Sequence, residues 1–307
     1  MQHTSETKLS PLWQRHHWPT WALMVGVYGA WVMLMNYASL LSWWLVSPLC
    51  ALLLCLHGSI QHELIHGHPS PWKRLNDALG WPPLSMWIPY YQYRDHHLLH
   101  HQTTVLTQPG LDPESYYHWP RKWHSMGRLM RKLWRVNHTF MGRMIIGPWL
   151  VMGLFLHSEV KQLVKGKLYD WNNWGLHLFL VSAMMMWLHS QGILWWQYLV
   201  FCVWPGLSLT LARSYAEHRP GDNNHERCAI VEGSWFTRVL FMNVNIHQVH
   251  HEFPQMPWFM VYGHWQCHRQ SILQRNGGYY YRSYWSLIKQ TLWRQKDSPI
   301  YPEKSHY

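Results

Sequence analysis

Charged side chains are scarce in this sequence, because Asp, Glu, Lys and Arg together make up only 13% of its 307 residues. Acidic residues are the rarer kind: 15 of them stand against 26 Lys and Arg, which gives a formal charge of +11. The basic residues flank apolar segments, whereas nucleic-acid binding requires a soluble basic surface. We therefore expect no nucleic-acid partner, and instead a membrane surface, acidic lipid or an acidic protein.

Cysteine is also rare, and its five positions do not pair. No C-x-x-C spacing occurs, and Cys50, Cys55 and Cys202 lie in apolar runs. This argues against a disulfide framework or a zinc knuckle and predicts buried, inert thiols. A secretory signal peptide is not expected either, because residues 1–18 are polar and no small-residue cleavage site follows.

Aromatic residues, by contrast, are abundant at 16%, with 24 Trp among them. Together with the low charge, this composition is typical of a membrane protein whose aromatic side chains gather at the lipid–water boundary. Four apolar runs fit that interpretation, at residues 19–35, 40–56, 174–188 and 193–212. The first two hold about 17 residues each, or about 26 Å of helix, which is the short end of what crosses a bilayer. In the fourth run, Pro205 predicts a kink.

These runs predict a single all-α integral membrane domain over residues 1–307, with four transmembrane helices in two hairpins. The hairpin linkers, 36–39 and 189–192, carry no charge, whereas thirteen Lys and Arg lie between residues 61 and 173 and eleven follow residue 212. By the positive-inside rule, both termini and the segments 61–173 and 213–307 are expected in the cytoplasm, where they form a helical cap. The apolar stretch within 142–157 is too short to cross and predicts a helix lying on the membrane.

Histidines, 25 in number, concentrate in three boxes. The first is HELIH at residues 62–66, the second HLLHH at 97–101, and the third HQVHH at 247–251. Helix positions i, i+3 and i+4 share one face, so each box presents its imidazoles together. Imidazoles gathered in this way are unsuited to a hydrophobic core but well suited to bind a metal ion. The sequence therefore predicts a metal centre that joins the three boxes.

Nine histidines are candidate ligands: His62, His66, His97, His100, His101, His218, His247, His250 and His251. Of these, His218 is outside the boxes but follows the fourth run much as His62 follows the second. His96 lies four residues before His100 and remains an alternative ligand. Nine imidazoles exceed the need of one ion and suit two, and nitrogen ligation with open positions fits redox iron acting on dioxygen. Carboxylates are expected to orient the rings, with Glu63, Asp95, Glu217 and Glu252 as candidates.

The boxes, their order and their placement beside four apolar runs resemble the membrane-bound fatty acid desaturase family. That family carries H-x(3–4)-H, then H-x(2–3)-H-H, and a final H-x(2–3)-H-H, which stand here as HELIH, HLLHH and HQVHH. The flanking segments NIHQVHHEFPQMPW and RSYAEHR resemble a bacterial branch that includes carotenoid ketolase-like and hydrocarbon oxygenase-like enzymes. The resemblance covers approximately residues 20–265.

This resemblance implies a non-haem diiron centre, with two Fe ions, that uses O2 and two electrons to attack an unactivated C–H bond. No separate side-chain base is predicted. The expected reaction is desaturation of a fatty acyl or related lipid chain. Hydroxylation or ketone formation on a lipid, hydrocarbon or carotenoid is the alternative on the same scaffold. The expected location is the bacterial inner membrane, with the active site on the cytoplasmic side.

Two functions of other classes remain open. The first box is also an H-E-x-x-H sequence, in which His62 and His66 would bind zinc and Glu63 would activate water in an intramembrane metalloprotease. That alternative leaves the second and third boxes unexplained. The second alternative function is metal binding or transport without catalysis. Transport would predict polar or charged groups within the spans, and the four runs are nearly free of them.

The sequence also lacks a haem, flavin or iron–sulfur motif, so each turnover would need two electrons from an external donor of the ferredoxin, rubredoxin or cytochrome type. Six basic residues could receive such a donor: Arg121, Lys122, Arg128, Arg131, Lys132 and Arg135. The last four recur at three- and four-residue intervals, so a helix would present them as one face. The same face could bind anionic lipid headgroups instead.

Overall fold

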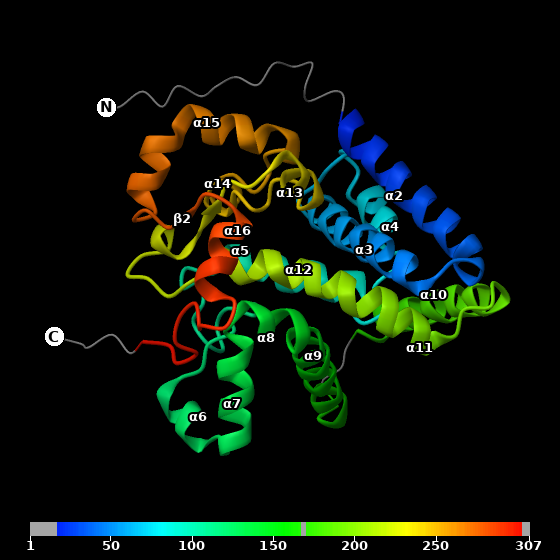
Figure 1. Cartoon of the computed structure of the whole chain (residues 1–307), viewed down its shortest axis with the longest axis horizontal. Coiled ribbons are helices and arrows are strands. Elements are labelled where there is room, and N and C mark those ends of the chain that lie inside the picture. The colour runs from blue at the N-terminus through cyan, green and yellow to red at the C-terminus, as the bar shows by residue number, and fades with distance from the viewer. Residues whose placement is uncertain (1–16, 167–169, 303–307) are drawn as a thin grey trace.

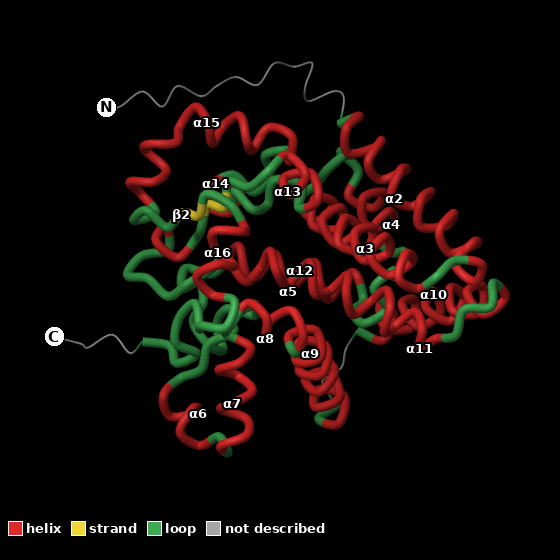
Figure 2. The backbone as a smooth tube through the Cα atoms, viewed as in Figure 1, coloured by secondary structure: helices red, strands yellow, loops and turns green. Residues whose placement is uncertain are grey.

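The computed structural model describes residues 17–166 and 170–302, which fold into an almost wholly helical molecule (Figure 1). Most of the N-terminal polar segment discussed above therefore lies outside the described residues. The described part contains one short sheet, in which β1 (Ile230–Val231) pairs in parallel with β2 (Tyr280–Tyr281). As Figure 2 shows, helices and loops make up nearly everything else.

The apolar runs form the longest helices. The N-terminal pair is α2 (Trp18–Tyr37) and α3 (Trp43–Ile65), joined by the turn η1 (Ala38–Leu40). The later pair is α10 (Trp171–Ser190) followed by α11 (Trp195–Tyr198), a π-helical turn η2 (Leu199–Val203) and α12 (Trp204–Glu217). Among the described residues, Trp18–Leu40 and Trp43–Ile65 are each long and apolar enough to cross a membrane. The segments Trp171–Ser190 and Trp195–Glu217 meet that test only as a pair, with a bend of 106° between them.

The structure thus has two or three candidate spans where the sequence predicted four. The fourth predicted span forms one helical segment, Trp195–Glu217, which contains the π-helical turn just before Pro205 in the first turn of α12. Proline is tolerated there because its missing N–H has no helical partner in that turn. The second predicted span also differs: its helix does not stop near residue 56 but continues to Ile65, and so carries most of the first histidine box.

Both uncharged linkers lie at the same end of the molecule, at the right of Figure 1. A Cβ added at Gly192, in the second linker, would lie 3.5 Å from the Cβ of Ser39 in the first. Between the pairs, the indole N–H of Trp31 on α2 donates to the hydroxyl of Tyr198 (3.1 Å), which donates to the carbonyl of Leu84 (2.7 Å). Buried hydrogen bonds of this kind fix how apolar helices are oriented relative to one another.

The remaining helices belong to the segments 61–173 and 213–307, which the sequence predicts to form a cap. They are α4 (Lys73–Gly80), α5 (Tyr90–Gln102), α6 (Pro120–Ser125), α7 (Arg128–Asn137), α8 (Phe140–Ile145), α9 (Gly147–Val164), η3 (His225–Arg227), α13 (Trp235–Leu240), α14 (His247–Glu252), α15 (Trp258–Arg275) and α16 (Tyr284–Thr291). The segment expected to lie on the membrane is split between α8 and α9. Large apolar side chains of α9, including Trp149, Leu154 and Val160, are exposed.

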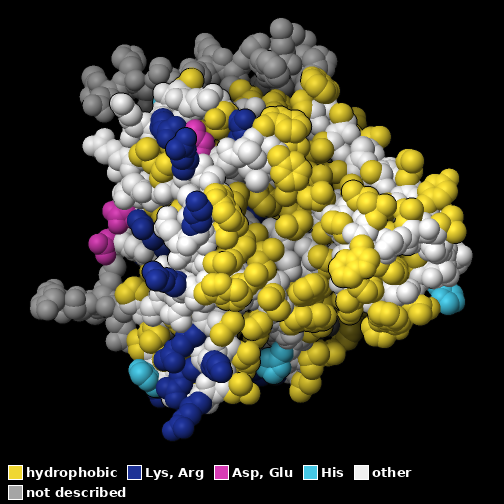
Figure 3. All heavy atoms as spheres, viewed as in Figure 1, with side chains coloured by type: hydrophobic (Ala, Val, Ile, Leu, Met, Phe, Trp, Pro, Cys, Tyr) yellow, Lys and Arg dark blue, Asp and Glu magenta, His cyan; other side chains and the backbone are white. Residues whose placement is uncertain are grey.

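Apolar side chains cover the surface on the side of the long helices (Figure 3). Those exposed on α2, α3 and α10 include Val25, Trp44, Phe179 and Met186. Lys and Arg side chains gather along the opposite edge and at the bottom of the same view. An apolar surface of this extent is what lipid would cover in a membrane protein.

Candidate metal centre

Each histidine box lies on or at the end of a helix, as its spacing predicted. His62 is in the last turn of α3 and His66 is the residue that ends this helix. The second box lies on α5 and the third on α14. His218 directly follows α12 in an extended conformation. The four helices converge, so that all nine predicted ligands lie in two neighbouring groups.

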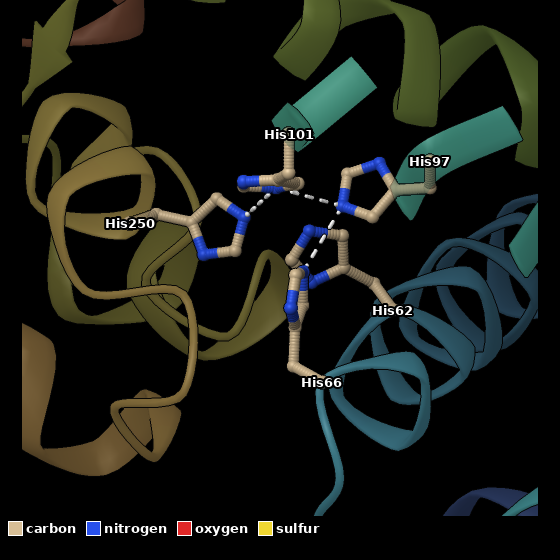
Figure 4. A group of neighbouring side chains, drawn as sticks. All are labelled: His62, His66, His97, His101 and His250. Carbon is tan, nitrogen blue, oxygen red and sulfur yellow. Dashed lines mark hydrogen bonds between the residues drawn. The ribbon is translucent and has the colours of Figure 1, made fainter. Parts of the chain in front are cut away.

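The first group contains five histidines: His62, His66, His97, His101 and His250. Their rings point toward a common centre from α3, α5 and α14 (Figure 4). The Nε2 atom of His97 lies 3.1 Å from the Nε2 atoms of both His66 and His101, and that of His250 lies 2.9 Å from that of His101. Two nitrogens bound at right angles to one ion, at about 2.1 Å each, would be about 3.0 Å apart. The spacing is therefore that of ligands around a metal ion.

The second group contains four histidines: His100, His218, His247 and His251. The Nε2 atom of His218 is 3.1 Å from that of His100 and 2.9 Å from that of His247, and the Nε2 atoms of His247 and His251 are 3.1 Å apart. Four nitrogens leave room for other ligands on a six-coordinate ion.

The H-x-x-H-H pattern explains why there are two groups. On α5, the i,i+4 pair His97 and His101 joins the first group, and His100 joins the second. On α14 the assignment is reversed: His247 and His251 join the second group, and His250 joins the first. Adjacent helical residues point about 100° apart, so consecutive histidines cannot serve one site. Each box therefore supplies both groups, which brings them close together: the rings of His101 and His251 have centroids 4.3 Å apart.

The buried rings lack enough hydrogen-bonding partners of their own. Both ring nitrogens of His62 are buried without a hydrogen-bond partner, and the side chain is 1% exposed. An unpaired buried polar group is costly, and a metal ion would satisfy it. Burial, together with the positive charge that His100 would carry, lowers the pKa of His218 to about 3, and its Nδ1 faces the carbonyl of Arg227 (3.2 Å), so the lone pair of Nε2 is available at neutral pH. The residues therefore fit two nitrogen-ligated metal ions.

Two carboxylates that the sequence analysis missed hold rings of both groups. Glu114 Oε1 lies 2.9 Å from His97 Nδ1, and Asp112 Oδ1 lies 2.8 Å from His100 Nδ1. A carboxylate at Nδ1 keeps the proton there and leaves Nε2 as the free ligand atom. Burial lowers the pKa of His100, but Glu114 and Asp112 outweigh this effect and raise it to about 9, so a metal ion would displace a proton from Nε2 on binding. Asp112 also accepts from the backbone N–H of Thr107 (2.7 Å) and Glu114 (2.9 Å), which fixes the loop.

The predicted carboxylates differ in how close they lie to the histidine rings. Glu217 comes nearest to a ring, with Oε1 3.6 Å from His247 Nδ1 and 2.9 Å from Arg213 Nε. Glu63 accepts from the backbone N–H of Trp258 (3.2 Å), and Asp95 pairs with Arg94 (2.9 Å).

The other two predicted residues also lie away from the nine rings. Glu252 pairs with Arg275 (2.8 Å) and lies 3.5 Å from Nδ1 of His225, which belongs to neither group. The alternative ligand His96 is exposed, packs near Phe155 and is not brought to either group. The sequence feature that could have identified Asp112 and Glu114 is their position in the loop with Pro and Gly that directly follows the second box. Acidic residues at such a place stand out in a chain that has few of them.

A comparison of the sequence with curated proteins finds no significant match. The family model described as fatty acid desaturase does match, over residues 38–285. This range includes all three histidine boxes, His218 and the loop with Asp112 and Glu114. The chain belongs to the fatty acid desaturase family.

Proposed function

We propose that this chain is an integral membrane diiron oxidoreductase that uses O2 and two electrons to desaturate a fatty acyl or related lipid chain. The observation that carries the proposal is the pair of adjoining imidazole groups, five and four in number. The first group would hold one iron and the second group the other. When bound, two irons supply the oxidising power for attack on an unactivated C–H bond.

A cavity of about 440 Å³ beside the first group is a suitable place for the substrate. It reaches His97 and Glu114 and runs between α3, α5, α9 and α12. Pockets for small ligands have volumes of this order. Apolar side chains of its wall, among them Leu54, Phe155 and Leu207, would exclude water and hold a hydrocarbon segment beside the metal-binding rings. Hydroxylation or ketone formation would need the same metal-binding groups and the same cavity, and it stays the alternative reaction.

The position of Glu63 favours this function over a zinc protease. In a protease, the Glu63 carboxylate would face a metal-bound water, whereas here it accepts from the backbone N–H of Trp258 at the start of α15. His62 and His66 are also accompanied by three further imidazoles, which exceeds the three protein ligands of a catalytic zinc site.

The expected orientation places the histidine groups and the cap in the cytoplasm, in a bacterial inner membrane. An external ferredoxin, rubredoxin or cytochrome would bring the electrons. Five of the six basic residues on α6 and α7 are exposed, namely Arg121, Lys122, Arg128, Lys132 and Arg135, and would suit an acidic donor protein. Leu129 on α7 is 72% exposed, which suits lipid contact. Lipid binding is therefore the alternative to donor binding at this surface.

Metal analysis of anaerobically purified protein tests the proposal directly. We expect about two Fe per chain, and lipid profiling of an expressing host should show a new double bond in a lipid chain. One tightly held Zn without iron would contradict the proposal and favour the protease. Two Fe with a new hydroxyl or keto group would keep the diiron centre and assign the alternative reaction.

A further inference from the structure

The His57 side chain is a buried polar group that the metal centre does not use. It lies on α3, is 0% exposed, and neither ring nitrogen has a hydrogen-bond partner of good geometry. The carbonyl of Pro82 lies near one side of the ring and can satisfy at most one of its two nitrogens. The neighbouring Tyr28 ring packs against His57 at 5.7 Å, but its hydroxyl donates to the carbonyl of Leu79.

His57 lines the cavity beside the metal centre. On α3 the cavity wall is formed by Leu54, His57, Gly58 and Gln61, which follow the i, i+3, i+4, i+7 spacing of one helical face. Gln61 is fixed there, because its Nε2 donates to the carbonyl of Gly80 (2.8 Å). The cavity thus has two polar side chains on its α3 wall, and others such as Arg213 and Ser214 on α12.

Gly58 keeps the space next to His57 open. A Cβ added at Gly58 would meet only Thr210 Oγ1, at 3.9 Å, whereas one added at Gly206 would lie 2.7 Å from the Cβ of Leu54. Helix packing therefore explains Gly206 but not Gly58. The absence of a side chain at Gly58, which also lines the cavity, leaves room for a ligand beside His57.

We propose that His57 accepts a hydrogen bond from the substrate, which therefore is an apolar molecule with a hydroxyl group, because the carbonyl of Pro82 already faces the N–H of the neutral ring. This inference rests on the proposed function. His57 precedes the metal-binding His62 by five residues, or about 7.5 Å along the helix. The hydroxyl oxygen of the substrate is thus expected within several bonds of the carbon that reacts, on the same apolar chain.

Binding of matched probes to the purified protein tests the inference. The probes are decane and two decanols, with the hydroxyl at the end or in the middle of the chain. We expect the wild type to bind at least one decanol about 2- to 12-fold more tightly than decane, the range of one net hydrogen bond. His57→Phe keeps the ring volume and should abolish this preference, whereas His57→Gln should retain part of it. The ratio of decanol affinity to decane affinity is compared between wild type and variant in one detergent, because partitioning into micelles changes this ratio equally for both proteins.

Two further variants locate the binding. Gly58→Leu should fill the cavity and weaken all three probes, whereas His189→Phe, at an exposed histidine near the end of α10, should change nothing. Equal binding of all probes to the wild type, or an unchanged preference in His57→Phe, would overturn the inference. Iron content is measured in parallel: two Fe without a hydroxyl preference would refute only this inference, whereas the preference without iron would refute only the proposed function.

Discussion

Asp112 Oδ1 lies 2.8 Å from Nδ1 of His100, and both side chains are 1% exposed. Removing the charge should weaken the hold on the ring and lower metal affinity at the second group. We expect Asp112→Asn to reduce metal affinity about 10- to 100-fold, measured by iron content during titration with a chelator. Glu114→Gln should act in the same way on the first group through His97. Asp95→Asn is the matched control and should retain both irons, because Asp95 pairs with Arg94. Equal losses in all three variants would contradict the assignment.

The two groups should be separable by single substitutions. His218→Ala leaves three histidines in the second group and all five in the first. We therefore expect about one Fe per chain, with the iron at the first group retained, as measured by metal analysis and Mössbauer spectroscopy. His96→Ala should keep two Fe, because His96 joins neither group. Complete loss of iron from His218→Ala would show that the groups fill only together.

Glu63→Gln distinguishes the oxidoreductase from the protease. The glutamine keeps an oxygen that can accept from the Trp258 N–H, so we expect two Fe, nearly unchanged lipid oxidation and a small fall in melting temperature. If the chain were a zinc protease, the same variant would keep its metal and lose hydrolysis of a membrane-embedded peptide. Detectable wild-type proteolysis that disappears in Glu63→Gln would reverse our assignment.

The basic residues on α6 and α7 give a prediction about salt. Attraction between exposed charges is screened over about 8–10 Å at physiological ionic strength. If the surface binds an acidic donor, turnover with a reconstituted ferredoxin should slow as salt rises, through weaker apparent donor affinity. Replacing both Arg131 and Arg135 with Glu should reproduce this loss at low salt, with iron content unchanged.

The same double variant also tests the lipid alternative. Leu129 and Met130 are exposed on the same helix, and a lipid-binding surface would use them together with the charges. If the double variant keeps its donor-dependent turnover but, in detergent-solubilised form, binds anionic liposomes more weakly, this surface binds lipid.

A buried ionic cluster at the C-terminal segment gives a prediction for acid stability. Asp297 accepts from the Tyr117 hydroxyl (2.6 Å) and lies 3.0 Å from His138 Nδ1. Burial alone would raise the pKa of Asp297, but Lys296, His138 and Tyr117 lower it to about 2 from 3.8. Because the folded pKa is the lower one, this stabilisation is present above about pH 4 and is lost as pH falls toward 2. We expect Asp297→Asn to melt at lower temperature near neutral pH and to show less additional loss below pH 4, measured by thermal unfolding in detergent.

Helical spacing was enough to find eight of the nine clustered histidines, because an i, i+3, i+4 pattern within one helix is a local property, whereas His218 was predicted from its place after the fourth apolar run. It could not separate His96 from His97, since each has a partner four residues away, and only the position of α5 against α3 and α14 shows which ring faces the centre. Asp112 and Glu114 were missed for a related reason: a loop returns them to the second box, and loops have no periodicity that reveals such a return.

The spans show the same limit. Hydropathy located α2, α3, α10 and the helical segment around α12. It gave no sign of the π-helical turn at Leu199–Val203, nor of the 106° bend between Trp171–Ser190 and Trp195–Glu217. Hydropathy averages over a window and carries no information on backbone direction. It also ended the second span too early, because the buried histidines near the end of α3 lower the average although the helix continues.

The helix α3 is both a candidate membrane span and a source of metal ligands, and this ties the chemistry to the thickness of the bilayer. From Trp43 to His62 it rises about 29 Å, close to the ~30 Å of a hydrocarbon core. A thinner or thicker membrane is accommodated by tilting or shifting such a helix, while the rings on α5 and α14 belong to shorter helices outside the candidate spans. A mismatch would therefore move His62 and His66 relative to the other ligands. Because α3 is rigid, the distances between the metal-binding nitrogens should depend on the acyl-chain length of the host lipids.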